Sequence, residues 1–136
     1  MFLRQLHRPL SQLTRAMSSG ASSATIKHNF FVYAPDKTEP GTLQRRLSVR
    51  ETHLGGAKER HETGFIQIGG AITTPEAITN PDAPKNMVGS VFLIQAESID
   101  DVKKMIENDI YYTSGVWDAD KIVIAPFFSA FPLPFQ

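Results

Sequence analysis

Hydrophobic and polar positions alternate in patterns that predict four strands and two helices. Runs rich in aromatic and β-branched residues predict strands at 28–34, 65–72, 88–96 and 121–125. Apolar residues at helical spacing predict a long helix over 42–62 and a shorter one that follows Ser98 as its N-cap and ends near 108. In the long helix, the expected buried stripe consists of Leu43, Leu47, Leu54 and Ala57.

The segments between these elements contain turn-forming residues. Three prolines within residues 73–86 predict a loop, and residues 109–115 read as a connection to the last strand. Gly69-Gly70 in the second strand predicts a bulge or a place where another group packs closely against the backbone.

The order of elements is β-α-β-β-α-β, which predicts an α+β, ferredoxin-like fold for residues 28–127. In such a fold both helices cover one face of the sheet, and the other face needs a cover. In about 100 residues no further element is left to provide it, so we expect a homodimer that packs sheet against sheet. The apolar tail, residues 128–136, is expected to lie over the domain or across the partner.

Composition narrows the possible functions. With 41% hydrophobic and 21% charged residues, the 136-residue chain is typical of one globular domain, and its zero net charge gives no basic excess for binding nucleic acid. The absence of Cys excludes disulfides and thiolate chemistry, and no apolar run is long enough to cross a membrane.

The first 25 residues differ from the rest. No acidic residue precedes Asp36, whereas Arg4, Arg8 and Arg15 are interspersed with apolar positions and followed by several serines. This composition is typical of a transit peptide, so residues 1–25 are expected to direct the protein to the mitochondrial matrix. A basic tail without function is the alternative.

Among the four histidines, His53 is the best candidate for chemistry. On a helical wheel it lies beside Arg46, Val49 and Arg50, at the margin of the expected buried face. Buried cations need partners, which are either carboxylates or an anionic ligand. From spacing alone, a structural role for His53 stays open. No metal site is expected, because no second His or Cys stands at ligand spacing from it.

Several motifs together resemble the YCII-related domain family. Residues 46–54, RLSVRETHL, resemble its RLxxRxxHL motif. Features that match the family follow in the same order, at Gly69-Gly70, Gly89-Ser90, 97–102, 108–117 and 125–127. The resemblance covers residues 28–127. It implies the fold of the dimeric α/β-barrel proteins and a pocket with a His–Asp pair that is proposed to be catalytic.

By motif, that pair is His53 and Asp109. The family's usual Pro after the Asp is Ile110 here, so the turn that aims the carboxylate is expected to be less constrained. A carboxylate that holds one ring nitrogen would make the other a general base. Arg46 and Arg50 would then hold an anionic substrate or stabilise an enolate.

Three functions are therefore compatible with the sequence. The first is a small-molecule enzyme, without redox cofactor or metal, that transfers a proton during elimination or isomerisation of an anionic or carbonyl substrate. The second is a non-catalytic dimeric module that binds an anionic metabolite through Arg46, Arg50 and His53. The third is an accessory domain with a vestigial pocket. The sequence does not identify the substrate.

Overall fold

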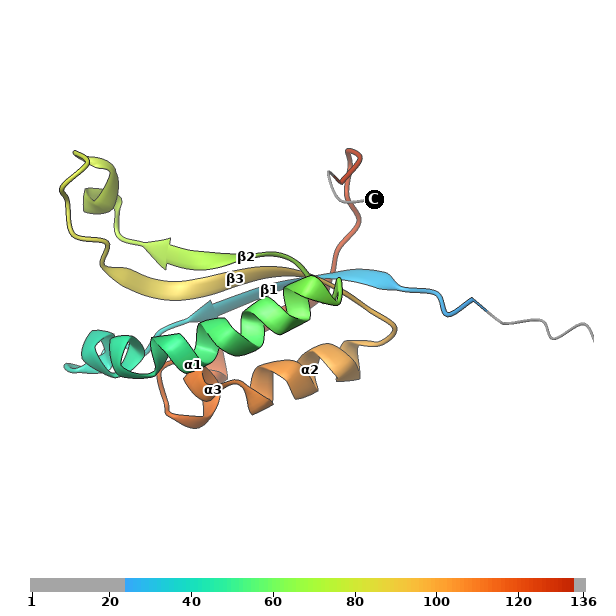
Figure 1. Cartoon of the computed structure of the whole chain (residues 1–136), viewed down its shortest axis with the longest axis horizontal. Coiled ribbons are helices and arrows are strands. Elements are labelled where there is room, and N and C mark those ends of the chain that lie inside the picture. The colour runs from blue at the N-terminus through green and yellow to red at the C-terminus, as the bar shows by residue number, and fades with distance from the viewer. Residues whose placement is uncertain (1–23, 134–136) are drawn as a thin grey trace, which may run out of the picture.

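The computed structural model describes residues 24–133, and within them four strands form one antiparallel sheet. The strands are β1 (His28–Pro35), β2 (Ile66–Thr73), β3 (Met87–Ala96) and β4 (Val123–Pro126), in the order β2-β3-β1-β4. Helices α1 (Thr42–Glu62) and α2 (Ile99–Asn108) and the short α3 (Ile110–Thr113) lie on one side of the sheet (Figure 1). The predicted α+β, ferredoxin-like fold is confirmed.

The segments expected to be irregular contain short helical turns. The loop after β2 includes the 3-10 turn Pro75–Ile78, and a second turn, Ala119–Lys121, precedes β4. The connection after α2 contains α3. Ser98 caps α2 as predicted, because its Oγ accepts a hydrogen bond of 3.2 Å from the Asp101 N–H.

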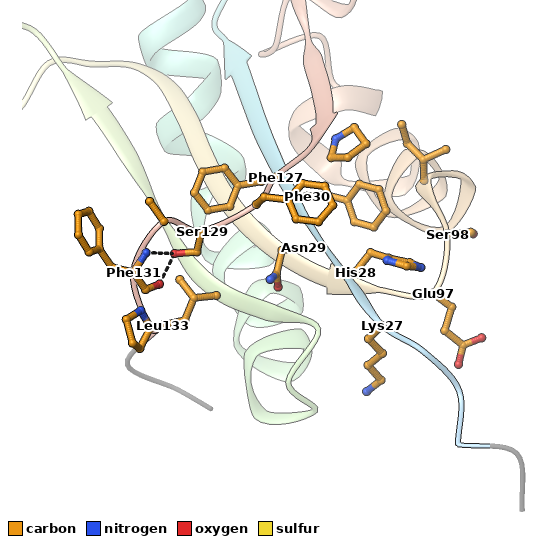
Figure 2. Close-up of a pocket in the computed structure, with 15 residues that line it drawn as sticks. Lys27, His28, Asn29, Phe30, Glu97, Ser98, Phe127, Ser129, Phe131 and Leu133 are labelled. Atoms are coloured by element: carbon orange, nitrogen blue, oxygen red, sulfur yellow. Dashed lines mark hydrogen bonds between the residues drawn. The ribbon is translucent and has the colours of Figure 1, made fainter.

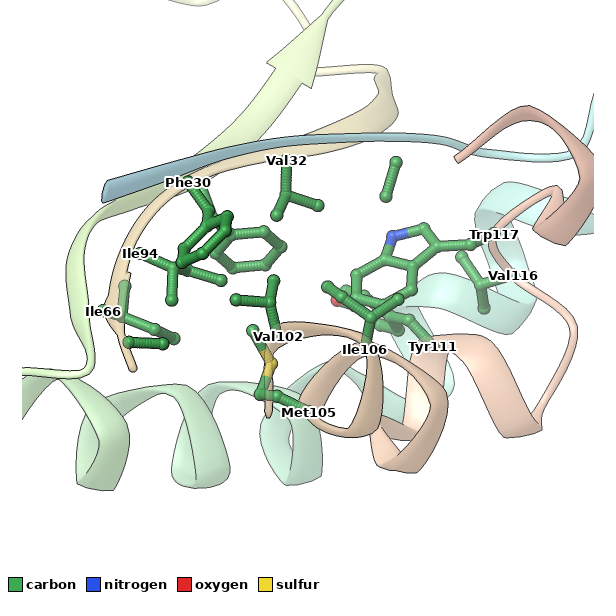
Figure 3. Packing of buried hydrophobic residues seen from close by; sticks show 13 residues of the cluster. Phe30, Val32, Ile66, Ile94, Val102, Met105, Ile106, Tyr111, Val116 and Trp117 are labelled. Atoms are coloured by element: carbon green, nitrogen blue, oxygen red, sulfur yellow. The ribbon is translucent and has the colours of Figure 1, made fainter. Parts of the chain in front are cut away.

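The core lies between the sheet and the second half of the chain. Alternate residues of β1 and β3 point toward α2 and the segment after it (Figure 3). Buried side chains there include Phe30, Val32, Phe92, Ile94, Val102, Met105, Ile106, Tyr111, Val116 and Trp117. No fully buried apolar side chain of this cluster comes from α1.

The buried face of α1 differs from the predicted one. Leu47 and Leu54 are 53% and 44% exposed, whereas Thr42, Arg46 and His53 are buried. The helix is rotated by roughly one residue step relative to its leucine stripe. Ala57 of the predicted stripe packs against the core. The prediction was wrong for Leu47 and Leu54, because hydrophobicity selected the leucines while the buried positions hold polar groups that have hydrogen-bond partners.

The face of the sheet away from the helices carries no helix within residues 24–133 (Figure 1). Phe31 and Tyr33 of β1 and Val123 of β4 are partly exposed there. The tail leaves on the same side of the sheet, with Phe128 93% exposed and Phe131 80% exposed, so it does not cover its own domain. Packing of the tail across a partner stays a prediction.

The proposed targeting segment, residues 1–25, lies almost entirely outside the described residues. Within the described part of the chain, no helix combines the length and apolar character that a membrane span requires.

Candidate active site

His53 and Asp109 meet in the interior, although 56 residues separate them in the sequence. The Nδ1 atom of His53 lies 2.8 Å from Oδ1 and 3.0 Å from Oδ2 of Asp109. Both side chains are buried, at 8% and 4% exposure. Because an ionised carboxylate only accepts hydrogen bonds, this geometry assigns the proton to Nδ1 and leaves Nε2 with a lone pair in neutral His53.

Asp109 is held by the ends of two helices. It ends α2 and is the N-cap of α3, where its Oδ1 accepts a hydrogen bond of 2.9 Å from the Tyr111 N–H. Ile110 occupies the first position of α3, at which Pro is favoured in helices. The cap therefore fixes the carboxylate toward His53 without the proline.

Aromatic rings enclose the imidazole of His53. The Tyr111 ring stacks on it, with centroids 3.9 Å apart and planes inclined by 16°. Trp117 and Phe92 lie at 6.0 and 6.4 Å. Burial raises the pKa of the Tyr111 phenol, and the nearby Arg46 and Arg50 oppose the rise. Tyr111 is therefore a neutral phenol at physiological pH.

Arg46 is occupied by the protein itself. Its Nη1 donates to Asp36 Oδ1 at 2.7 Å and its Nη2 donates to Ser90 Oγ at 2.9 Å. Its guanidinium carbon lies 4.5 Å from the Tyr111 ring centroid. Desolvation raises the pKa of the Asp36 carboxyl, and the charge of Arg46 and its hydrogen bond oppose that rise. Both terminal nitrogens of Arg46 thus contribute to a structural cluster.

His53 and Arg50 line a pocket of about 730 Å³ between α1 and β2. Residues of α1 form one wall, and β2 with parts of β3 forms the other. Gly69 stands in the β2 wall, where a Cβ atom would lie 3.1 Å from the Phe92 ring. The predicted close packing at this glycine is thereby confirmed. The register irregularities of β2 lie elsewhere, between Ile66 and Ile68 and between Ile72 and Thr73.

The charges around this pocket have one sign. Its wall includes Arg50, which is exposed, and Lys58, and no Asp or Glu is among the residues that line it. Arg50 forms no ion pair with any residue in the range 24–133. The charged side chains that line the pocket are therefore cationic.

His61 is a residue of this pocket that sequence reasoning missed. It lies near the end of α1 and is exposed. However, its Nδ1 lies 2.8 Å from the Ile66 carbonyl oxygen, and the side chain lines the pocket. The signal was the spacing of Arg50, His53, Ala57 and His61 at three and four residues, which places them on one helix face.

A second pocket of about 740 Å³ lies at the start of β1 (Figure 2). The exposed tail forms much of its wall, and Ser129 bonds to the backbone of Phe131 within the tail itself. Lys27, His28 and Glu97 face it without forming an ion pair with one another. In residues 24–133, no group of three or more potential metal ligands converges.

Known proteins resemble this chain over most of its folded part. The model of the YCII-related domain matches residues 30–126. Fusaric acid biosynthesis protein 2 of Gibberella fujikuroi is 30% identical over 104 residues, which cover 76% of this chain and 96% of that protein. Protein YciI of Escherichia coli O6:H1 is 28% identical over 102 residues, which cover 75% and 98% of the two chains.

The fold also resembles that of a solved enzyme. The structure of 5-chloro-2-hydroxyhydroquinone dehydrochlorinase from Burkholderia phenoliruptrix, in complex with 2,5-dihydroxybenzoquinone, aligns with a TM-score of 0.60 and 28% identity. The alignment covers 74% of this chain and 93% of that chain. The similarity therefore extends over almost the whole of the solved enzyme.

Proposed function

Because the chain belongs to the YCII-related domain family, we propose that it is a small-molecule enzyme that transfers a proton through His53 and Asp109. The observation that carries the proposal is that the two ring nitrogens of His53 have different surroundings. The carboxylate binds Nδ1, while the side chain lines the pocket, so Nε2 is the nitrogen available to a ligand.

In the proposed reaction, Nε2 of neutral His53 removes a proton from a carbon next to a carbonyl group. The electron pair of the C–H bond moves into an enolate, and Asp109 stabilises the imidazolium that forms. A leaving group on the adjacent carbon then departs with its electrons, or the proton returns at another carbon. These outcomes are elimination and isomerisation. Tyr111, stacked on His53, keeps the ring in place.

The proposed substrate is a small anionic or carbonyl compound. The dehydrochlorinase of similar fold binds 2,5-dihydroxybenzoquinone, a compact ring with acidic hydroxyl groups. In this chain, the cationic wall of the pocket supports an anion of that kind, and Arg50 is the guanidinium best placed to hold the developing enolate oxygen. Arg46 is bound to Asp36 and contributes to the framework of the site.

Deuterium exchange tests the proton transfer directly. The probe is 2,5-dihydroxybenzoquinone, whose ring C–H groups exchange with D₂O by addition and removal of a proton at carbon. We expect the protein to accelerate this exchange, measured by NMR. His53→Asn should lower the acceleration by about 10²-fold or more. In this variant the Asn Nδ2 replaces Nδ1 and preserves the bond to Asp109.

Binding is measured separately by the fluorescence of Trp117, the one tryptophan in the sequence, which lies next to His53. His53→Asn should change the probe's affinity much less than the exchange rate. If the wild-type protein binds the probe tightly without accelerating exchange, the non-catalytic binding module is the better interpretation.

We also propose that two copies associate through the uncovered face of the sheet. Phe31, Tyr33 and Val123 give this face the apolar character of an interface. Light scattering on the purified protein should give twice the chain mass, and Phe31→Asp should give the mass of one chain. A wild-type monomer at micromolar concentration would contradict the proposal.

Import into the mitochondrial matrix is a further proposal, supported by the basic, acid-free composition of the first 25 residues. Residues 1–27 fused to a fluorescent reporter should direct it to mitochondria. A diffuse cytosolic signal would contradict this proposal.

A further inference from the structure

Two histidines of α1 face the same pocket, and the proposed reaction uses only His53. The other is His61, near the end of the helix. A ligand-binding role for His61 would identify the class of substrate, and it rests on the proposed function only in that both concern ligands of this pocket.

The two imidazoles are held in the same way. A carbonyl oxygen only accepts hydrogen bonds, so the contact of 2.8 Å between His61 Nδ1 and the Ile66 oxygen requires the proton on Nδ1. As in His53, Nε2 is then the nitrogen without a partner among residues 24–133. Both histidines therefore line the pocket with their rings fixed by a contact at Nδ1.

The spacing of the two residues along α1 sets the scale of a ligand that contacts both. Eight residues separate His53 from His61, so their backbones lie about 12 Å apart along the helix axis. A six-membered ring with oxygen substituents at opposite ends, extended at each end by one hydrogen bond of about 2.8 Å, spans a similar length. A smaller acid with one functional group would reach only one histidine.

The surroundings of His61 favour an oxygen with negative charge. Lys58 lies one turn earlier and also lines the pocket, whose wall contains no carboxylate. The ion pair of Lys58 with Glu62 is long, at 3.9 Å, and both side chains are mostly exposed, so it neutralises little of the charge. Gln67 also faces the pocket, with its Nε2 bonded to the Gly64 carbonyl.

We propose that His61 is a second ligand-binding residue of this pocket, and that the ligand is a ring that carries acidic hydroxyl groups at opposite ends. One end lies at His53, where the proton is transferred. The oxygen at the other end shares a proton with Nε2 of His61. That proton resides on the nitrogen when the oxygen is the more acidic partner, which gives an ion pair.

Two substitutions separate ligand binding by His61 from its bond to Ile66. In His61→Asn, the Asn Nδ2 takes the place of Nδ1, which preserves the bond to the backbone and removes the group that faces the ligand. In His61→Gln, the amide takes the place of Nε2 and the backbone bond is lost. His28→Asn is the matched control, because His28 lies on β1 and does not line this pocket.

The probes are 2,5-dihydroxybenzoquinone, with hydroxyl groups at opposite ends of the ring, and 2-hydroxy-1,4-benzoquinone, which lacks one of them. Trp117 fluorescence gives the affinities. His61→Asn should weaken binding of the dihydroxy probe about tenfold, the effect of one lost hydrogen bond to a charged group. His61→Gln and His28→Asn should bind it nearly as tightly as the wild type. The monohydroxy probe should bind equally to wild type and His61→Asn.

Three results would overturn the proposal. The first is that the wild type does not bind the dihydroxy probe, and the second is that His61→Asn binds this probe as tightly as the wild type. The third is that His61→Asn and His61→Gln lose the same affinity, and lose it equally for both probes. The last result would mean that His61 only braces the turn into β2. Because these are affinities, they are independent of the deuterium exchange that tests proton transfer. Absence of exchange with the predicted affinities would refute the catalytic function alone.

Discussion

Arg46 and His53 lie on the same face of α1, two helical turns apart, and each is buried against a carboxylate. The two residues differ in which of their nitrogen atoms have no partner. Arg46 contacts Asp36 and Ser90 through both terminal nitrogens. His53 contacts Asp109 through Nδ1 alone. Burial and a carboxylate partner alone therefore do not show whether a side chain can react with a ligand. The atom that remains open to the pocket distinguishes the two residues.

The two pairs also differ in how well the fold satisfies them. Arg46 Nε and Asp36 Oδ2 are buried without a hydrogen-bond partner among the described residues, whereas Oδ1 of Asp109 accepts from both His53 and Tyr111. An unsatisfied buried polar atom costs about 1–3 kcal/mol. The Arg46–Asp36 pair therefore leaves two buried polar atoms without hydrogen bonds, and breaking the pair would add to their number.

The largest expected effect follows from breaking that pair. Arg46→Met leaves the Asp36 carboxyl buried without its cation, and should lower the free energy of unfolding by about 3–5 kcal/mol, measured by urea denaturation. The double variant Arg46→Met, Asp36→Leu should recover much of the loss, because apolar side chains replace both charges. A loss below about 1 kcal/mol in the single variant would mean that the pair is not structural.

A second substitution tests whether the pocket beside His53 must stay open. In Gly69→Ala the new Cβ would meet the Phe92 ring at 3.1 Å and Ile66 Cγ2 at 3.3 Å. We expect a loss of about 1–3 kcal/mol in stability and weaker binding of 2,5-dihydroxybenzoquinone. The matched control is Gly70→Ala, whose Cβ would meet nothing within 4 Å. Equal effects at both glycines would contradict this account.

Asp109→Asn tests the second pair without removing its shape. The amide oxygen can still cap α3, but the charge that fixes His53 as the Nδ1–H tautomer is lost. The accelerated exchange of the probe should fall roughly tenfold or more. The ¹⁵N shifts of His53 should change from those of one tautomer to a mixture. Unchanged shifts would show that Asp109 does not control the imidazole.

The smallest effect is a dependence of stability on pH that comes from Asp36 in the first pair. Burial raises the pKa of Asp36 above its usual 3.8. Above pH 3.8 the unfolded chain therefore loses this proton first, and the folded state binds more protons. The contribution of Asp36 to stability thus decreases as the pH rises through this range. The difference in free energy of unfolding between the wild type and Asp36→Asn should therefore become less favourable to the wild type as the pH rises. Urea denaturation at several pH values measures this difference.

Much of the fold followed from local patterns. Strand runs and helical spacing predicted the element order, and the cap at Ser98 depends on residues three positions apart. The motif RLSVRETHL also identified His53, and the downstream motif identified Asp109. The element and cap predictions succeeded because propensity and capping are properties of short segments. The structure brings His53 and Asp109 into contact, and their catalytic role stays a prediction.

Only the tertiary structure decided how the polar residues of α1 are used. The sequence placed Arg46 and His53 at the edge of a leucine face, and left open whether carboxylates or a ligand would pair with them. The fold buries that edge and brings Asp36 and Asp109 to it from other segments. It thereby occupies Arg46, leaves Nε2 of His53 open, and adds His61 to the same pocket. Helical periodicity cannot distinguish these outcomes, because the partners are set by contacts between distant segments.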